Sequence, residues 1–153
     1  GRGAFPARIS YPQPKDRHRI MTDDSQHSTS YALPFPTLQL GLSMPDSGST
    51  DQTHIALVDT GADITLVPLH LLKQIGARPI DEVRLRSHWG ESTSFITYLV
   101  DVRFESGVLP GIEVVGDPHN DEILLGRNIL NMLILLVDGP GQLTSILNKR
   151  PIR

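Results

Sequence analysis

A single carboxylate at the end of an apolar strand constrains this chain more than any other feature. Residues 54–58 form a short expected strand, and Asp59 follows directly, with Thr60 and Gly61 after it. Apolar and β-branched residues resume at 64–67, so the acid stands in a tight turn between two expected strands. A carboxylate at such a place is costly unless another group satisfies it or a reaction uses it. The sequence therefore singles out Asp59 as a candidate catalytic residue.

The composition indicates one mostly β domain. The chain has 153 residues, of which 39% are hydrophobic, enough for a single core. Its 12 prolines and 13 glycines separate short apolar runs, a pattern typical of many short strands and turns. We expect strands at residues 37–42, 54–58, 64–67, 83–85, 95–104, 112–115, 123–126, 133–137 and 143–147. Two short helices are expected at residues 68–75 and 127–132.

Charge and residue usage exclude several classes of function. The formal charge of -3 leaves no broad basic surface, which argues against nucleic acid as a partner. No apolar run has the length of a membrane span and no secretory signal pattern is present, so we expect no membrane partner and a cytoplasmic or viral location. The absence of cysteine excludes disulfides, thiolate metal sites and cysteine nucleophiles. The 6 histidines show no ligand spacing, and we expect neither a metal nor a cofactor.

Two motifs, in this order, resemble those of the retropepsin family of aspartic proteases. Asp59 opens a DTGAD sequence, and residues 123–128 read ILLGRN. The resemblance covers roughly residues 36–147. It implies a closed β-barrel of the acid-protease fold, with one short helix after the DTG loop and one after the ILLG block. Such a chain is half of a pepsin-like bilobal enzyme and is completed as an obligate homodimer.

The expected activity is that of an aspartic endopeptidase. Peptide hydrolysis by this route needs two carboxylates that share one proton and hold a water between them. This chain has one DTG triplet and no internal repeat, so two copies must meet across a two-fold axis. Asp59 of each copy is then expected to activate the water that cleaves extended protein or peptide substrates, with apolar residues beside the cut.

The resemblance also assigns roles to the residues around Asp59. Thr60 would brace the two loops of the dimer through its hydroxyl, or make only a local bond within its turn. Gly61 has no Cβ, so its amide can reach a carboxylate. Ala62, which is small, suits the floor of the substrate cleft. Asp63 would line the cleft wall.

A second group of residues is expected to support this loop. In the family, the acid of DTGAD pairs with the arginine of the GRN sequence, which implies an ion pair between Asp63 and Arg127. An arginine holds a carboxylate in a two-pronged geometry that lysine does not reproduce. The alternative is two unrelated surface charges. Leu125 and Gly126 would lie beneath the loop, where a glycine allows close packing.

A hairpin tip at residues 87–93 is the candidate for the flap that closes over the substrate in this family. Gly90 would provide the turn, and Trp89 would cover the cleft. The tip departs from retroviral flaps because it lacks their multiple glycines. Trp89 is alternatively a partly buried packing residue.

The ends of the chain lead to three further expectations. Residues 1–35 are rich in proline and polar residues, and we expect a flexible leader, a pro-segment or an expression tag ahead of the protease domain at 36–147. The bond between Phe35 and Pro36 resembles a self-processing site, although an ordinary proline turn is the alternative. The hairpin at 133–147 resembles that of the cellular DNA-damage-inducible relatives and is expected to carry the dimer interface. Residues 148–153 form a basic, frayed end.

A rival class of function is a catalytically silent module for dimerisation or peptide binding on the same fold. The intact DTG triplet, together with Asp63 and Arg127, argues against it. A stable dimer that binds peptide without cleaving it would favour it.

Overall fold

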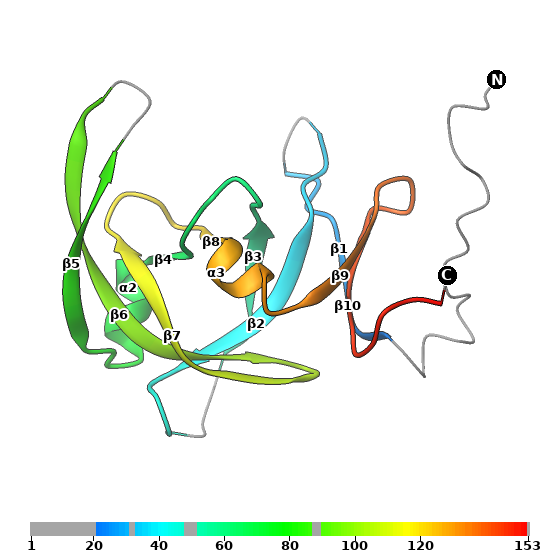
Figure 1. Cartoon of the computed structure of the whole chain (residues 1–153), viewed down its shortest axis with the longest axis horizontal. Coiled ribbons are helices and arrows are strands. Elements are labelled where there is room, and N and C mark those ends of the chain that lie inside the picture. The colour runs from blue at the N-terminus through cyan, green and yellow to red at the C-terminus, as the bar shows by residue number, and fades with distance from the viewer. Residues whose placement is uncertain (1–20, 31–32, 48–51, 87–89, 153) are drawn as a thin grey trace.

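The computed structural model describes residues 21–30, 33–47, 52–86 and 90–152, and its ribbon is shown in Figure 1. Within these residues, ten strands and two short helices follow one another. In order they are β1 (Met21–Gln26), β2 (Thr37–Ser43), β3 (His54–Val58), β4 (Leu66–Pro68), α2 (Leu69–Gln74), β5 (Pro79–Arg86), β6 (Ser92–Phe104), β7 (Gly107–Asp117), β8 (Ile123–Leu125), α3 (Arg127–Leu130), β9 (Ile134–Asp138) and β10 (Leu143–Leu147). Within the described part of the chain, no helix is both long and apolar enough to cross a membrane.

The larger sheet closes on itself as a barrel. Its seven strands run in the order β2-β3-β8-β4-β7-β6-β5, and an additional pairing between β2 and β6 joins the two sides. β2 makes this closure because it pairs with β3 through Thr37–Leu40 and then with β6 through Gly41–Ser43. The barrel therefore contains six strands, and β5 lies outside it, paired with β6 alone among the described strands. The expected mostly β, closed-barrel architecture is confirmed.

The core explains why β8 is apolar at every position. β8 runs parallel to β3 and antiparallel to β4, so it lies inside the sheet with neighbours on both edges. A short strand in such a place is buried on both faces and reads as a continuous apolar run. Leu125 at its end is fully buried and pairs with Val58, directly before Asp59. The core thus fixes the position at which Asp59 leaves β3.

The two helices lie where the sequence predicted them. α2 follows Pro68 and presents Leu72 to the core. It ends at Gln74, and Gly76 follows with a left-handed φ of 70° and an amide that donates to the Lys73 carbonyl. Glycine takes this conformation without the steric cost of a Cβ, which explains the stop. α3 follows Gly126 and buries Ile129 and Leu130.

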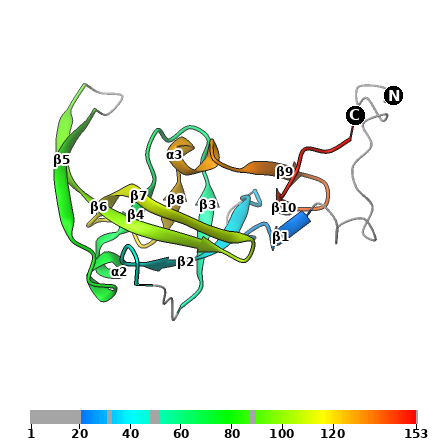
Figure 2. The ribbon, with the colours of Figure 1, turned by 60° about the horizontal axis from the view of Figure 1, so that its bottom comes forward.

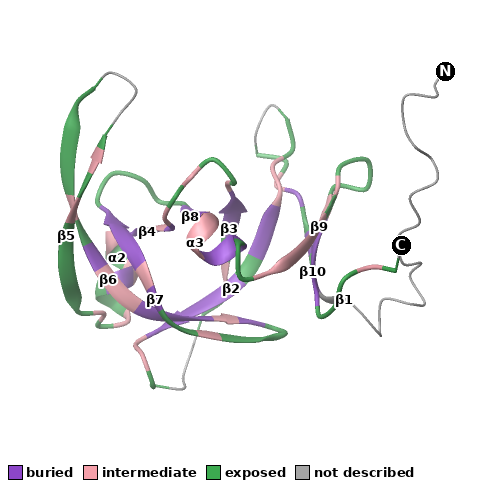
Figure 3. Cartoon of the chain, viewed as in Figure 1, coloured by how far each residue is buried: buried purple, intermediate pink, exposed green. Residues whose placement is uncertain are grey.

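The β5–β6 hairpin is longer than the sequence predicted. We expected a first arm at 83–85, whereas β5 spans Pro79–Arg86 and pairs with β6 as far as Arg86 and Ser92. Most of β5 is exposed, so its outer positions need no apolar side chain and give little sequence signal. Figure 2 shows the hairpin projecting away from the barrel, and Figure 3 shows that exposed residues dominate β5.

The smaller sheet includes residues that precede the expected domain boundary at residue 36, and that boundary stays a prediction. β1 lies within the segment that we expected to be a leader, yet it pairs with β10, which pairs in turn with β9. The hydroxyls of Ser25 and Thr37 lie 2.9 Å apart, and the Thr37 hydroxyl donates to the Gln26 carbonyl at 2.7 Å. Backbone pairing and polar contacts therefore hold β1, where the sequence shows no apolar alternation. Residues 1–20 lie outside the described residues.

The C-terminal hairpin of β9 and β10 is present as predicted from the glycine-rich turn. Residues 148–152 follow β10 without forming a strand or helix, and the expectation of a frayed end for 148–153 stays a prediction.

Candidate active site

Asp59 lies in the loop that joins β3 to β4, at the open end of the barrel. Its amide donates to the Leu125 carbonyl at 3.0 Å, which continues the pairing of β3 with β8 past the end of the strand. The Ala62 amide donates to the Asp59 carbonyl at 3.2 Å and closes the turn. Figures 1 and 2 show that this loop, the β7–β8 loop and the arms of the β5–β6 hairpin rise on the same side of the molecule. A substrate reaching Asp59 would therefore lie among these three segments.

The Gly61 amide holds the Asp59 carboxylate in place. It donates to Asp59 Oδ1 at 2.9 Å, and a Cβ built on Gly61 would lie 3.2 Å from the same oxygen. The absence of a side chain therefore allows this close approach. This hydrogen bond fixes the orientation of the carboxylate. Asp59 is half-buried in the single chain, while Thr60 and Gly61 are exposed.

Arg127 binds the loop at three points. Its guanidinium pairs with the Asp63 carboxylate through Nη2 and donates through Nη1 to the Thr60 carbonyl at 2.6 Å. Its backbone amide donates to the Ala62 carbonyl at 2.8 Å. The expected contact between Asp63 and Arg127 is thus present in the structure. The two charges are therefore not unrelated.

The energy of this ion pair is small, because the Asp63 side chain is 87% exposed and the Arg127 side chain 42%. Exposed pairs of this kind contribute about 0–1 kcal/mol to the free energy of unfolding. Arg127 acts mainly by holding the shape of the turn, because its guanidinium contacts both Thr60 near the start and Asp63 at the end.

Gly126 lies directly beneath the loop, as the sequence predicted. A Cβ at this position would meet the backbone of Ile64 at 2.6 Å and the Ala62 carbonyl oxygen at 3.0 Å. The Gly126 amide donates to the hydroxyl of Thr65 at 3.0 Å. The loop and the strand below it are therefore packed backbone against backbone.

Thr65 and Asn128 form a hydrogen-bond network to which the sequence analysis assigned no role. Asn128 Oδ1 accepts from the Thr65 amide at 2.9 Å and from its hydroxyl at 2.8 Å. Asn128 Nδ2 donates to the Glu113 carbonyl on β7 at 2.8 Å. Thr65 is buried. The sequence signal that could have pointed to this network is a threonine inside an apolar run. The network ties the chain after the Asp59 loop to β7 and to the GRN sequence.

Replacement of Asn128 by Ala is expected to lower the free energy of unfolding by about 2 kcal/mol or more, because three hydrogen bonds are lost and a buried amide is left without its acceptor. Urea unfolding followed by circular dichroism measures the effect. The control is Asn131→Ala, at an exposed position three residues further on, which should change stability by less than about 0.5 kcal/mol. Equal effects of the two substitutions would contradict a role for the network.

A structural carboxylate, that of Asp117, ends β7 directly before the β7–β8 loop. Burial raises the pKa of Asp117, but hydrogen bonds from the amides of His119 and Asn120 and from the Asn120 side chain outweigh it, and the pKa falls below the ordinary 3.8. Because the pKa of Asp117 is lower in the folded chain than its ordinary value of 3.8, ionised Asp117 stabilises the fold at pH values above 3.8. This contribution is lost as the pH falls through the lowered pKa.

The hairpin tip is only partly described. Trp89 lies outside the described residues, so its expected role over the cleft stays a prediction. Gly90 has a left-handed φ of 83°, a conformation that suits the turn role predicted for it. On the hairpin arms, Val83 and Leu85 are half-buried, as is Phe95 across from Val83. One face of the hairpin is thus apolar.

In the described ranges, no three histidine, aspartate or glutamate side chains are placed to hold a metal ion. The arrangement offers instead one oriented carboxylate in a loop braced from below and from the side.

A closed barrel with a braced Asp-Thr-Gly loop defines a retropepsin-like aspartic protease. Comparison with family models agrees, since residues 49–132 match the family described as "gag-polyprotein putative aspartyl protease". The match covers more than half of the chain, and the chain belongs to this family. A search of curated protein sequences gave no match.

Two solved structures, with TM-scores of 0.50 and 0.54, show the same fold at low sequence identity. The EIAV protease in complex with the inhibitor HBY-793 is 18% identical, with a TM-score of 0.50 over 69% of this chain and 93% of that one. A retropepsin-like aspartic protease from Rickettsia conorii is 16% identical, with a TM-score of 0.54 over 81% of this chain and 88% of that one. The retroviral protease-like domain of Ddi1 from Leishmania major is 15% identical, with a TM-score of 0.46 over 74% and 90%.

Proposed function

We propose that this chain is an aspartic endopeptidase that works as a homodimer. The observation that carries the proposal is the Asp59 carboxylate, oriented by the Gly61 amide in a loop that Arg127 braces. In the dimer, the two Asp59 carboxylates share one proton and hold a water. One takes a proton from the water as it attacks the peptide carbonyl, and the other donates its proton to the carbonyl oxygen. The tetrahedral intermediate then breaks with proton transfer to the leaving nitrogen.

The dimer is proposed because each chain supplies one Asp59. The sheet of β1, β10 and β9 offers a surface for it, since β9 has a strand partner on only one side within the described part of the chain. Met132 is 55% exposed and Val137 51% exposed beside this free edge. A second copy pairing along β9 would bury these side chains and satisfy the edge. The hairpin of β9 and β10 would then carry the interface, as the sequence analysis expected.

The substrate is proposed to be an extended peptide with apolar residues on both sides of the cut. The half-buried face formed by Val83, Leu85 and Phe95 supports this preference, because it provides apolar surface on the hairpin that would cover the peptide. An extended peptide can add its backbone hydrogen bonds to such a strand.

The test is a peptide-library digest read by mass spectrometry, with and without pepstatin. We expect cleavage between apolar residues, inhibited by pepstatin, with a specific activity that rises with protein concentration until the dimer is saturated. Binding of peptides by a stable dimer, with no cleavage between about pH 3 and pH 7, would favour the silent module and contradict the enzyme.

Self-processing at Phe35–Pro36 is proposed to require local opening. Phe35 exchanges backbone hydrogen bonds with Ser28 at 2.8 and 3.0 Å, and the Pro36 carbonyl accepts from the Val58 amide at 2.9 Å. The bond is therefore held in the fold and cannot enter an active site until these contacts break. This part of the proposal extends the protease function to the chain's own N-terminal segment.

A synthetic peptide copying residues 31–40 is expected to be cut at least about tenfold faster than the same bond in the intact chain, because the peptide needs no opening step. Intact-mass measurements over a time course compare the two substrates at equal concentration. Cleavage of the intact chain at the rate of the peptide would contradict the proposed restraint.

A further inference from the structure

A buried carboxylate of β1, that of Asp23, faces the barrel. Asp23 is 8% exposed, and neither of its carboxylate oxygens accepts a hydrogen bond of normal geometry from the described residues. An ionised carboxylate in this situation loses its hydration without replacement and destabilises the state that buries it. Its neighbour Asp24 differs, because it is exposed and accepts from the Ser145 hydroxyl at 2.7 Å.

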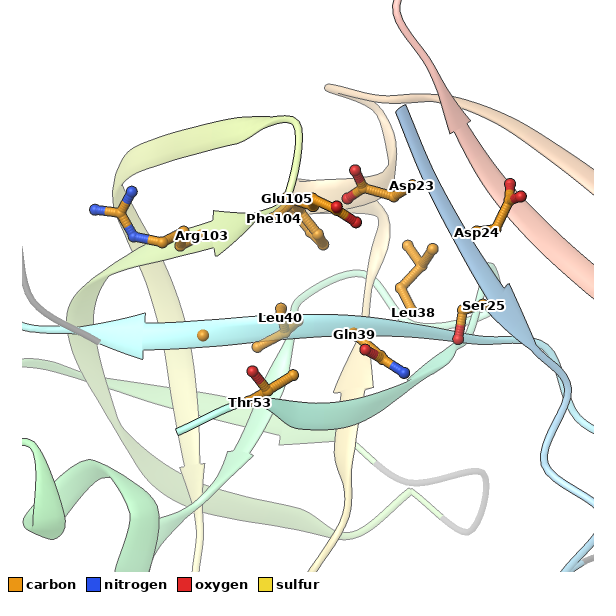
Figure 4. Close-up of a pocket in the computed structure, with 11 residues that line it drawn as sticks. Asp23, Asp24, Ser25, Leu38, Gln39, Leu40, Thr53, Arg103, Phe104 and Glu105 are labelled. Carbon is orange, nitrogen blue, oxygen red and sulfur yellow. The ribbon is translucent and has the colours of Figure 1, made fainter. Parts of the chain in front are cut away.

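Asp23 lies in a cavity between the two sheets. The cavity has a volume of about 300 Å³ and is lined by residues of β1, β2, β6 and the turn after β6, among them Asp23, Gln39, Arg103 and Glu105. Figure 4 shows the Asp23 and Glu105 carboxylates on the same side of the cavity, while Asp24 points away and Arg103 extends to the far end. The seam between the β1 sheet and the barrel therefore contains two carboxyl groups.

The charges around Asp23 favour its neutral form. Burial raises the pKa of Asp23, and the negative charge of Glu105 raises it further. The amides of Glu105 and Ser106 and the Ser106 hydroxyl act in the opposite direction but do not outweigh these effects. Among the described residues, the other ionisable groups that line the cavity are Asp24 on β1 and Arg103 on β6. β2 and β10 carry none, and the buried His27 follows directly after β1.

The remaining contacts of β1 favour docking. β1 pairs with β10 along its length, and the Ser25 and Thr37 hydroxyls join it to β2. When it is ionised, the buried Asp23 carboxylate opposes this docking, and a proton is the smallest ligand that removes the penalty.

We propose that protonation of Asp23 controls the docking of β1 on the barrel. β1 is held in the seam in acid and loosens as Asp23 ionises. Because the docked state binds the proton more tightly, the stabilisation is complete below the ordinary Asp pKa of 3.8 and is lost as the pH rises through the raised value. The inference does not depend on the proposed protease activity.

The test is hydrogen–deuterium exchange of the intact chain, expressed as protection factors corrected for the pH dependence of intrinsic exchange. We expect the protection of β1 to fall at least about threefold between pH 3.5 and pH 7.5, relative to that of β6 and β7. In Asp23→Asn, which is neutral at all pH values, protection should change by less than about 1.5-fold over this range.

Two further variants complete the design. Asp24→Asn, on the opposite face of β1, should keep the wild-type fall, and Glu105→Gln, which leaves β1 unchanged, should reduce it. If wild-type β1 is equally protected at both pH values, or if both Asp23→Asn and Glu105→Gln show the full wild-type fall, the proposal is overturned. It is also overturned if about 5 mM calcium restores protection at pH 7.5 as fully as acid does, because the cavity is then a cation site.

Discussion

Replacement of Asp59 by Asn is expected to lower peptide cleavage by at least about a thousandfold, because the amide cannot take a proton from water or share one with its symmetry mate. The fold should persist, since the Asp59 backbone amide still bonds to Leu125 and the side-chain oxygen can still accept from Gly61. Cleavage of a reporter peptide and size-exclusion chromatography in the same buffer measure activity and assembly together.

The matched control for this substitution is Asp46→Asn. Asp46 lies after β2, outside the Asp59 loop, and its left-handed φ of 65° suits asparagine as well as aspartate. This variant should keep the activity within about twofold of wild type. Retention of cleavage by Asp59→Asn in a preparation free of other proteases would contradict the mechanism.

Replacement of Gly126 by Ala is expected to lower the free energy of unfolding by about 3 kcal/mol or more, the upper range for overpacking. The new Cβ would lie 2.6 Å from the Ile64 carbonyl carbon and 2.7 Å from its oxygen, and these are backbone atoms that cannot rotate away. The shift needed to relieve the contact would displace the chain between Ala62 and Thr65. Activity should fall with stability, because the same segment carries Asp63 and ends the Asp59 loop.

Urea unfolding measures this loss, with Gly139→Ala as the control. A Cβ at Gly139 has no neighbour within 4 Å and the residue has no left-handed φ, so this variant should stay within about 0.5 kcal/mol of wild type. A Gly126→Ala protein as stable as the control would show that the loop and β8 are not packed as described.

The parts of the site that the sequence predicted are those encoded locally. Asp59 follows its strand directly, and the Gly61 amide reaches its carboxylate because the two residues belong to one turn. The contact between Asp63 and Arg127 joins distant residues, and it was predicted only through the resemblance of the two motifs. Gly126 was predicted to pack closely for the same reason, and the structure adds which backbone atoms it meets.

The parts that the sequence missed depend on tertiary pairing. β1 consists of polar residues and becomes a strand because β10, more than a hundred residues later, pairs with it. β5 is mostly exposed, and its pairing with β6 determines how far the strand extends. Thr65 and Asn128 lie far apart in sequence, so the network between them became visible only when the barrel closed.

The central claim, that one Asp59 from each of two chains builds the active site, is tested most directly by mixing subunits. Wild-type and Asp59→Asn chains are unfolded together in equal amounts and refolded, and activity is measured at a fixed total concentration where the dimer is saturated. If each active site needs both aspartates, only dimers of two wild-type chains cleave, and activity should be about one quarter of that of the wild type. Activity of about one half, proportional to the wild-type fraction, would show that each chain acts alone and would contradict the account.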